Sequence, residues 1–481
     1  MRAGGTHARF RPRALRDERS GFGPLQPDEA PGNRQIGWYR GLSSPLLMAG
    51  ALFLESENML DLNLIRSNTD FVKEALKKRE YDVDFTELLA WDARRRELIL
   101  ENENAKAESN KKSKEIPMRK KQGLDASDLL NELKELKEKI AVMDAEQSEL
   151  EEKIRRFVLA LPNLPAEDVV AGGKENNRPV KVFGEKPVFE FEPKNHVDLC
   201  TSLGLIDYER GVKMGGNGFW LYTGEGAKLE WALLNYFITE HLKDGYEFML
   251  PPHILTYECG LTAGQFPKFE DDVFRLTEEG FHFLLPTAET ALINLYRGEI
   301  LNEADLPKRL FAYTPCYRRE AGTYRASERG MIRGHQFNKV EMFGYTRPED
   351  SDAMLQELIG KACRLVEGLG LHYRLSKLAA GDCSASMATT YDIELWIPSM
   401  NEYKECSSVS NARDYQARRG NIRFRRAESK KLEYVHTLNG SGLATSRLMP
   451  AIVEQFQQPD GSVIVPEKLR PFYGKDRITK K

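Results

Sequence analysis

The stretch 315–337 carries the residues whose types and spacing most clearly suggest chemistry. Arg318 is followed by Glu320, and Arg333 and Phe337 come after an intervening polar segment. If this segment joins two paired strands, the guanidinium of Arg318 would grip the α-phosphate of ATP in a forked contact. Glu320 would accept from the adenine amine, and Phe337 would stack on the purine. Such a clamp neutralises charge that builds on the α-phosphorus, which predicts adenylate formation.

Two further segments add carboxylates. Glu289 follows Thr287 on a predicted strand-to-helix turn, where it would receive an ammonium group. A helix that Thr287 caps, with Glu289 in its first turn, explains the same pair. Glu405 and Ser408 follow an apolar run, and a carboxylate with a hydroxyl suits Mg²⁺, which prefers oxygen ligands.

A glycine-containing segment, NGSGLA at 439–444, precedes Arg447. Its glycines allow the backbone to approach a ligand closely. Arg447 would cover the second face of adenine or meet the γ-phosphate. A glycine-rich turn that caps a helix is the alternative interpretation. The sequence has no GxxxxGK[ST] and no strand-borne GxGxxG, so we do not expect a P-loop or a Rossmann site.

The elements that must position these residues lie after Val180. Short aromatic and β-branched runs, such as FNKVEMFGYT and YDIELWIP, alternate with amphipathic helices at 227–242 and 352–369. This alternation is typical of an α+β domain on a mainly antiparallel sheet. The fold class we predict is therefore α+β, with a helical arm in front of this domain.

The predicted arm spans 85–161, with a break at 123–125 and Pro117 near the bend. Its second limb repeats apolar residues with heptad spacing, which predicts an antiparallel coiled coil. A coil that joins two chains is the alternative. The heptad positions are Leu129, Leu133, Leu136, Ile140, Met143, Gln147, Leu150 and Ile154. Cations that would suit a nucleic-acid backbone are Lys106, Lys111, Lys112, Lys114, Arg119, Lys120 and Lys121.

Residues 1–58 are rich in Gly, Pro and Arg without periodicity, so we expect disorder there. A transit peptide and a signal peptide fit this segment less well than an upstream extension of a protein that starts at Met59. The predicted domains are a helical domain at 59–163, a linker at 164–180, a catalytic domain at 181–475 and a basic tail at 476–481.

Composition limits the partners and the compartment that we expect for this chain. The net charge of −3 means that any nucleic-acid contact depends on local clusters of cations. The six cysteines form no CxxC pair, so we expect no structural zinc, and scattered thiols indicate a reducing, cytoplasmic compartment. No apolar run approaches the roughly 20 residues that span a bilayer, so we expect no membrane partner.

Together, these segments resemble the class II aminoacyl-tRNA synthetases, and within them the seryl-tRNA synthetase family. Residues 318–337 are similar to motif 2, 440–447 to motif 3, and GYEFMLPP at 245–252 to motif 1. The TAE, KVEM, ECSS and NGSG segments and the coiled-coil arm resemble features of the seryl branch. The resemblance covers Met59 to about Gly474.

The resemblance implies roles by position. Serine would be held by Thr287, Ala288, Glu289, Glu341, Asn439 and Ser441. ATP would be held by Arg318, Arg319, Glu320, Gly334, Phe337, Glu405, Cys406, Ser407, Ser408 and Arg447. Arg318, Glu320 and Arg447 would form the catalytic set. Glu405 and Ser408 would bind Mg²⁺, and the loop 321–332 would touch the end of tRNA.

The implied activity is serine activation with Mg·ATP, followed by transfer to tRNA(Ser), and to tRNA(Sec) where it exists, by a homodimer. Cys406, Ser446 and the segment ECGLTA depart from the family pattern. A ligase that loads a carrier protein would lack the arm, and a regulatory paralogue would not need the retained motif residues. A duplicate specialised for resistance to a serine-mimicking inhibitor stays open.

Overall fold

The computed structural model describes residues 60–320 and 330–480. The interpretations of 1–58 as a disordered leader and of Met59 as a start concern residues outside this part of the chain. Most of the loop 321–332 also lies outside it. Within the described ranges, no helix is long and apolar enough to cross a membrane.

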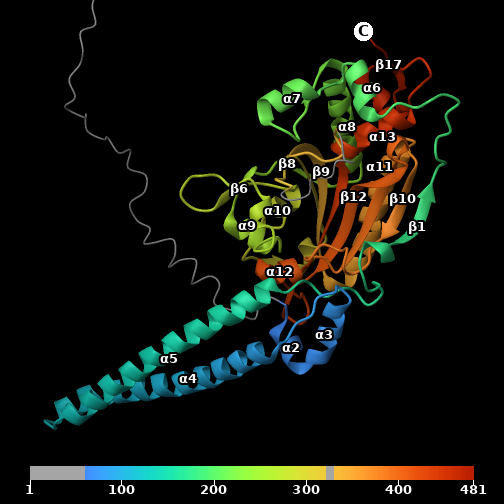
Figure 1. The fold of residues 1–481 in the computed structure, drawn as a ribbon. Helices are drawn as coiled ribbons and strands as arrows, with labels where there is room; N and C mark the ends of the chain where they lie inside the picture. The colour runs from blue at the N-terminus through green and yellow to red at the C-terminus, as the bar shows by residue number, and fades with distance from the viewer. Residues whose placement is uncertain (1–59, 321–329, 481) are drawn as a thin grey trace, which may run out of the picture. The chain divides into compact units, whose positions relative to one another are not determined.

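The N-terminal described part is helical. Two short helices, α2 (Leu62–Ser67) and α3 (Thr69–Lys77), precede two long ones, α4 (Thr86–Lys121) and α5 (Ser127–Ala160). The long helices lie side by side and run antiparallel (Figure 1). The predicted hairpin arm is therefore confirmed, and Pro117 lies inside α4 near its end at Lys121.

The heptad positions of α5 pack against α4. Its buried or half-buried apolar side chains include Leu129, Leu133, Leu136, Ile140, Met143, Leu150 and Ile154. Ion pairs between the helices flank this seam, because Arg94 lies 2.9 Å from Glu146 and Lys112 lies 2.8 Å from Glu132. An apolar seam with charged flanks is the arrangement that holds two helices together.

An eight-stranded sheet carries the rest of the fold, in the order β1–β10–β11–β12–β15–β9–β8–β4. Its neighbouring strands run antiparallel, except that β4 runs parallel to β8, so the predicted mainly antiparallel sheet is confirmed. Its strands are β1 (Arg178–Phe183), β4 (Glu247–Met249), β8 (Lys308–Tyr317), β9 (Gln336–Thr346), β10 (Tyr373–Lys377), β11 (Thr389–Ile397), β12 (Glu402–Arg413) and β15 (His436–Ala444).

Smaller elements surround this sheet. The short strands are β2 (Ile206–Asp207), β3 (Leu221–Tyr222), β5 (Ile254–Thr256), β6 (His282–Leu284), β7 (Ile300–Asn302), β13 (Arg423–Arg425), β14 (Leu432–Tyr434), β16 (Val463–Ile464) and β17 (Arg477–Ile478). The remaining α-helices are α6 (His196–Ser202), α7 (Tyr208–Gly215), α8 (Gly224–Lys243), α9 (Tyr257–Thr262), α10 (Ala288–Leu292), α11 (Ser351–Gly368), α12 (Tyr415–Arg419), α13 (Thr445–Gln455) and α14 (Arg470–Tyr473).

The two faces of the sheet bury different helices. Val340 and Met342 of β9 pack with apolar side chains of α8, α11 and α13. Phe343 and Tyr345 of the same strand pack with α10 and α12 on the opposite face. Because side chains alternate along a strand, the polar Lys339 and Glu341 must lie on the face of α10.

Candidate active site

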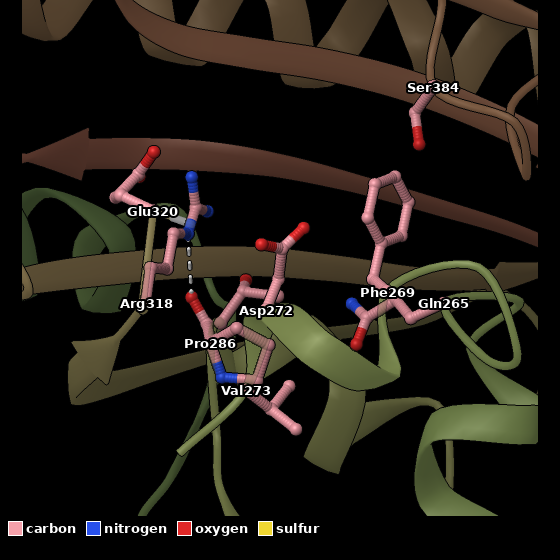
Figure 2. A pocket seen from close by; sticks show the side chains of 9 residues that line it. Gln265, Phe269, Asp272, Val273, Pro286, Arg318, Glu320 and Ser384 are labelled. Carbon is pink, nitrogen blue, oxygen red and sulfur yellow. Dashed lines mark hydrogen bonds between the residues drawn. The ribbon is translucent and has the colours of Figure 1, made fainter. Parts of the chain in front are cut away.

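Two paired strands bring the predicted arginine and aromatic ring together. In the register of β8 and β9, Cys316 lies opposite Phe337, and the Arg318 amide continues the ladder to the His335 carbonyl at 2.9 Å. The Arg318 guanidinium lies 5.3 Å from the centroid of the Phe337 ring. Its Nε donates to the Pro286 carbonyl at 3.3 Å (Figure 2). The clamp is thus built from the end of a hairpin.

Arg318 opens onto a hollow of about 270 Å³. Figure 2 shows Arg318 and Glu320 at one side of it and Phe269 with Ser384 at the other. The lining residues are Gln265, Phe269, Asp272, Val273, Pro286, Thr287, Arg318, Glu320 and Ser384. A guanidinium at the wall of a hollow this size is placed to meet an anionic group of a ligand.

A smaller hollow adjoins the first one and shares Glu320 with it. Glu320 accepts a hydrogen bond from Arg333 at 2.7 Å, so the predicted adenine-binding carboxylate is already engaged by a guanidinium. The lining residues are Glu320, Ile332, Arg333, Gly334, Phe337, Glu405, Cys406, Ser441, Ala444, Ser446 and Arg447. Most of the predicted ATP ligands therefore gather around Glu320.

Arg447 lies in the first turn of α13 and reaches back to β12. Its Nη1 donates to the Glu405 carbonyl at 2.6 Å and lies 3.4 Å from Glu405 Oε2. Its Nε donates to the Ile332 carbonyl at 3.2 Å. These contacts hold the guanidinium in the wall of the second hollow, which Phe337 also lines, so both side chains can contact a flat ligand there.

The predicted Mg²⁺ ligands lie near a third oxygen donor. Ser408 stands opposite Asp392 in the register of β11 and β12. Asp392 Oδ1 has no hydrogen-bond partner among residues 60–320 and 330–480, and burial together with the Glu405 charge raises the pKa of Asp392 well above its usual value. No three His, Cys, Asp or Glu side chains converge into a metal cage within residues 60–320 and 330–480. Two carboxylates and a hydroxyl fit Mg²⁺ that takes its other ligands from phosphates.

The predicted serine ligands form a second cluster. Thr287 caps α10 by accepting from the Glu289 amide at 3.3 Å, so the capping interpretation is correct. The same hydroxyl accepts from the buried Lys339 ammonium at 2.6 Å. Lys339 also lies 2.5 Å from Glu341 Oε2, and Glu341 stands opposite Ser441 across β9 and β15.

Glu289 is buried among polar side chains. It accepts from Gln416 Nε2 at 2.7 Å. Burial, and then the charge of Glu341, raise the pKa of Glu289 to about 7, against smaller opposing effects of Gln416, Lys339 and Asn439. An ammonium ligand would favour the ionised carboxylate, because opposite charges stabilise each other at low effective dielectric.

Some predicted residues lie apart from the two hollows. Ser407 donates to the Ser441 carbonyl at 2.6 Å, so its hydroxyl ties β12 to β15. Arg319 is exposed and donates to the Asp271 carbonyl at 3.0 Å. The Ala288 side chain packs in the apolar cluster beneath α10. These three side chains thus make structural contacts.

The glycine-rich segment forms strand β15, so the interpretation as a turn is wrong. A Cβ on Gly442 would lie 2.4 Å from His241 Nε2, which shows that this glycine allows α8 to approach the strand. A Cβ on Gly334 would likewise lie 2.1 Å from the Trp220 ring. Both glycines serve close packing behind the site.

Two buried residues that contact the serine cluster were missed by the sequence reasoning. Lys339 could have been found, because it stands two residues before Glu341 and so shares its strand face. Gln416 gives no such signal, since only the folded chain brings it to Glu289.

Two of the residues that depart from the family pattern lie at the second hollow. Ser446 lines this hollow, and so does the buried Cys406, where burial raises the pKa of the thiol well above its usual value. The ECGLTA segment forms most of α9.

Comparisons with known proteins agree with this geometry. A family model described as the seryl-tRNA synthetase N-terminal domain matches residues 59–165, and the class II core domain of the G, H, P, S and T synthetases matches 274–456. A Clostridium acetobutylicum protein named serine–tRNA ligase 2 is 66% identical over 87% of this chain and 100% of its own length.

Solved structures give the same result. Seryl-tRNA synthetase from Pyrococcus horikoshii, complexed with ATP, has a TM-score of 0.82 and 34% identity, over 88% of this chain and 100% of that one. The cytoplasmic serine–tRNA ligase of Naegleria fowleri, in complex with AMP, has a TM-score of 0.79 and 28% identity, over 88% and 99%.

Proposed function

The chain belongs to the seryl-tRNA synthetase family of class II, ATP-dependent ligases, and we propose that its two hollows activate L-serine and pass it to tRNA(Ser). One observation carries the assignment of the site. Arg318 stacks on Phe337 and also donates to the carbonyl of Pro286, the residue before Thr287. The nucleotide clamp and the serine cluster are therefore joined at one guanidinium.

In the first step, a carboxylate oxygen of serine attacks the α-phosphorus of ATP. The bond to the bridging oxygen breaks, and pyrophosphate leaves with the electron pair. Arg318 would bind the α-phosphate and the serine carboxylate, so charge that develops in the transition state is met by a fixed cation. In the second step, the terminal ribose hydroxyl of tRNA attacks the acyl carbon, and AMP leaves.

Adenine would lie between Phe337 and Arg447, which both line the smaller hollow. Glu320, held by Arg333, would accept from its amine. Mg²⁺, held by Glu405 and Ser408, would neutralise phosphate charge when bound. Its fit rests on the oxygen donors described above.

Serine would be recognised by the cluster around Lys339. Glu289 and Thr287 would meet its ammonium group, and Glu341 with Ser441 would meet its hydroxyl. Glu341 Oε2 has an ionic partner in Lys339 but no hydrogen-bond partner among the described residues, so it can still accept from a substrate hydroxyl. Alanine would forgo this bond, which is the basis of selection against it.

The arm would bind tRNA by shape and backbone, as helical RNA requires. Of the seven predicted cations, Lys106, Lys112 and Arg119 form ion pairs along the arm. The other four of the seven, which are exposed and have no ion pair among the described residues, are Lys111, Lys114, Lys120 and Lys121. We assign the phosphate contacts to these four. The loop 321–332 would reach the acceptor end, and tRNA(Sec) would be a second substrate where it exists.

A homodimer is proposed from the edge of the sheet at β4. The exposed fraction of the side chains there is large for apolar groups, at 53% for Trp231 of α8 and 74% for Leu250 after β4. Such side chains at the centre of an interface contribute most to association. We also propose a cytoplasmic location, in which the six free, buried cysteines stay reduced.

We keep the predicted domain division at 59–163, 164–180 and 181–475, with a tail at 476–481, as part of this proposal.

The activation assignment is tested by serine-dependent exchange of pyrophosphate into ATP. Arg318→Ala should abolish exchange, because it removes the cation that would meet both the α-phosphate and the serine carboxylate. Arg309→Ala is the control, since Arg309 is a partly exposed arginine of the same strand that pairs with Glu357. Exchange that persists in Arg318→Ala would refute the central role of the clamp.

Arm function is tested by deletion of 104–141 with a short glycine turn in its place, which keeps the Arg94–Glu146 pair at the base. Exchange should persist, while charging of tRNA(Ser) should fall by orders of magnitude, since the four lysines are lost. Charging that survives at the original rate would contradict the assigned role.

A further inference from the structure

The short helix α12 stands between the serine cluster and the base of the arm. Its Gln416 is 1% exposed and contacts the catalytic side only. Tyr415 and Arg419, on the same helix, contact α5. Helix α12 therefore carries contacts to two separate parts of the chain, and Figure 1 shows it beside the C-terminal end of α5.

On the catalytic side, the Gln416 amide is fully used. Its Nε2 donates to Glu289 Oε1 at 2.7 Å and to the Ala263 carbonyl at 3.0 Å. Its Oε1 accepts from the Thr437 hydroxyl at 2.8 Å. Because both the amide nitrogen and the amide oxygen have partners, only one orientation of the amide satisfies all three bonds. In that orientation one N–H of Nε2 points at Glu289 and the other at the Ala263 carbonyl.

On the arm side, α12 satisfies carbonyls at the C-terminal end of α5. These groups have no partner within their own helix, and a cation near them also meets the negative end of the helix dipole. Arg419 Nη2 donates to the Leu159 carbonyl at 2.8 Å, and the Tyr415 hydroxyl donates to the Leu161 carbonyl at 2.7 Å. Arg419 also donates to Tyr415 at 2.6 Å, which makes the two contacts one unit.

Arg419 extends this unit to the wall of the first hollow. Its Nη1 donates to the carbonyls of Leu261 and Phe266, both at 3.3 Å. The chain between them includes Gln265, which lines the hollow and accepts from the Thr290 hydroxyl at 2.9 Å. By contrast, the residues assigned to adenine and phosphate come from the segments that join β8 and β9, from β9 itself, and from β12 and α13.

We propose that Gln416 is a positioning residue that orients Glu289 for the serine ammonium group. Through α12, the affinity for serine would also depend on the position of the C-terminal end of α5, which forms the base of the arm. This inference rests on the proposed function, because it takes Glu289 as a ligand of serine. It adds a residue outside the sequence motifs and a physical connection from the arm to amino-acid binding. ATP affinity does not depend on this connection.

The first test compares matched glutamine variants in serine-dependent exchange. Gln416→Met keeps the volume but removes the donor to Glu289, and we expect the KM for serine to rise at least about tenfold, as for a lost bond to a charged group. The KM for ATP should stay within about twofold. Gln455→Met is the control, because Gln455 is also a buried, hydrogen-bonded glutamine but contacts His372 and Trp396.

A pH profile separates positioning from simple loss of stability. The groups that face Glu289 are Glu341 and Lys339 from β9, Gln416 from α12, Asn439 from β15 and Thr287 before its own helix. Without Gln416, the carboxylate loses a donor that favours its charged form. The midpoint of the pH dependence of serine KM should therefore move to higher pH in Gln416→Met, and not in Gln455→Met.

The second test addresses the arm. Arg419→Met should raise the KM for serine several-fold, since small misplacements of a binding group are costly. Arg426→Met is the control, because Arg426 is also a partly buried arginine but pairs with Glu303, Glu349 and Glu433, none of which belongs to the arm. If Arg419→Met does not fold, Tyr415→Phe removes the hydroxyl contacts and keeps the ring.

Each outcome decides the inference. Equal effects on serine and ATP in Gln416→Met, or an unchanged serine KM, would overturn the role of Gln416. Equal behaviour of the Arg419 and Arg426 variants would overturn the connection to the arm. Glu289→Gln separates the inference from its premise: if that variant binds serine normally, the proposed serine site is wrong, whereas a weakened Glu289→Gln beside a normal Gln416→Met refutes only the inference.

Discussion

Replacing Glu289 by glutamine should stabilise the fold while it weakens serine binding. The side chain is buried, and burial beside Glu341 raises its pKa from 4.5 to about 7. The ionised carboxylate is therefore unfavourable unless an ammonium group is bound beside it. A neutral amide of the same shape avoids that strain but can no longer attract an ammonium group.

The magnitude follows from the two pKa values. One pKa unit is worth about 1.4 kcal/mol, so the gap between 4.5 and about 7 corresponds to about 3 kcal/mol. Because the folded pKa is the higher one, this stability is present below pH 4.5 and is lost as the pH rises through 7. The wild-type protein should carry the full cost of ionisation near pH 8, and Glu289→Gln should carry none.

Urea titration at pH 5 and pH 8 measures the difference. Glu289→Gln should gain about 2 kcal/mol relative to the wild type between these two conditions. Serine binding should show the opposite trend, because for a pKa of about 7 the ionised fraction of Glu289 rises from about one tenth at pH 6 to about nine tenths at pH 8. The serine KM of the wild type should thus fall about tenfold over this range. A variant that is destabilised equally at both pH values would refute the reasoning.

Three further predictions concern other parts of the site and the surface. Lys339→Met should destabilise the fold by about 3–5 kcal/mol, since it leaves the buried Glu341 without its ionic partner. Lys361→Met is the control and should cost less, because its partner Asp244 is partly exposed. Equal losses of unfolding free energy in urea titration would contradict this. Glu405→Gln should raise the Mg²⁺ concentration for half-maximal exchange at least about tenfold, and an unchanged Mg²⁺ titration would argue against this ligand. Trp231→Glu should shift the protein from dimer to monomer in analytical ultracentrifugation; an unaltered sedimentation coefficient would place the interface elsewhere.

The arm was readable from the sequence because its information is local. Heptad spacing and a glycine break specify two helices and their contact within one continuous segment, and the structure has α4 and α5 there. The predicted strands FNKVEMFGYT at 337–346 and YDIELWIP at 391–398 were readable for the same reason, since alternation and β-branched composition act over a few residues, and they fall in β9 and β11. Motif spacing likewise singled out Arg318 and Phe337, whose side chains lie together in the structure.

Partners that lie far apart in the chain were not readable. The NGSG segment looks like a turn because glycine favours turns, yet it forms β15, where Gly442 makes room for His241 of α8. The engagement of Glu320 by Arg333 and the use of the Ser407 hydroxyl between strands depend on side-chain directions that the residue types leave open.

The sequence by itself determined the fold class, the arm and the residue types of the two binding clusters, since these follow from periodicity and from motifs within short segments. Only the tertiary structure decided which residues hold those types in place. Lys339 lies between Thr287 and Glu341 because an adjacent helix packs on one face of β9. Gln416 reaches Glu289 across more than a hundred residues of chain, and its helix caps α5. The physical reason is that burial and long-range hydrogen bonds, unlike local propensity, exist only once distant segments pack together.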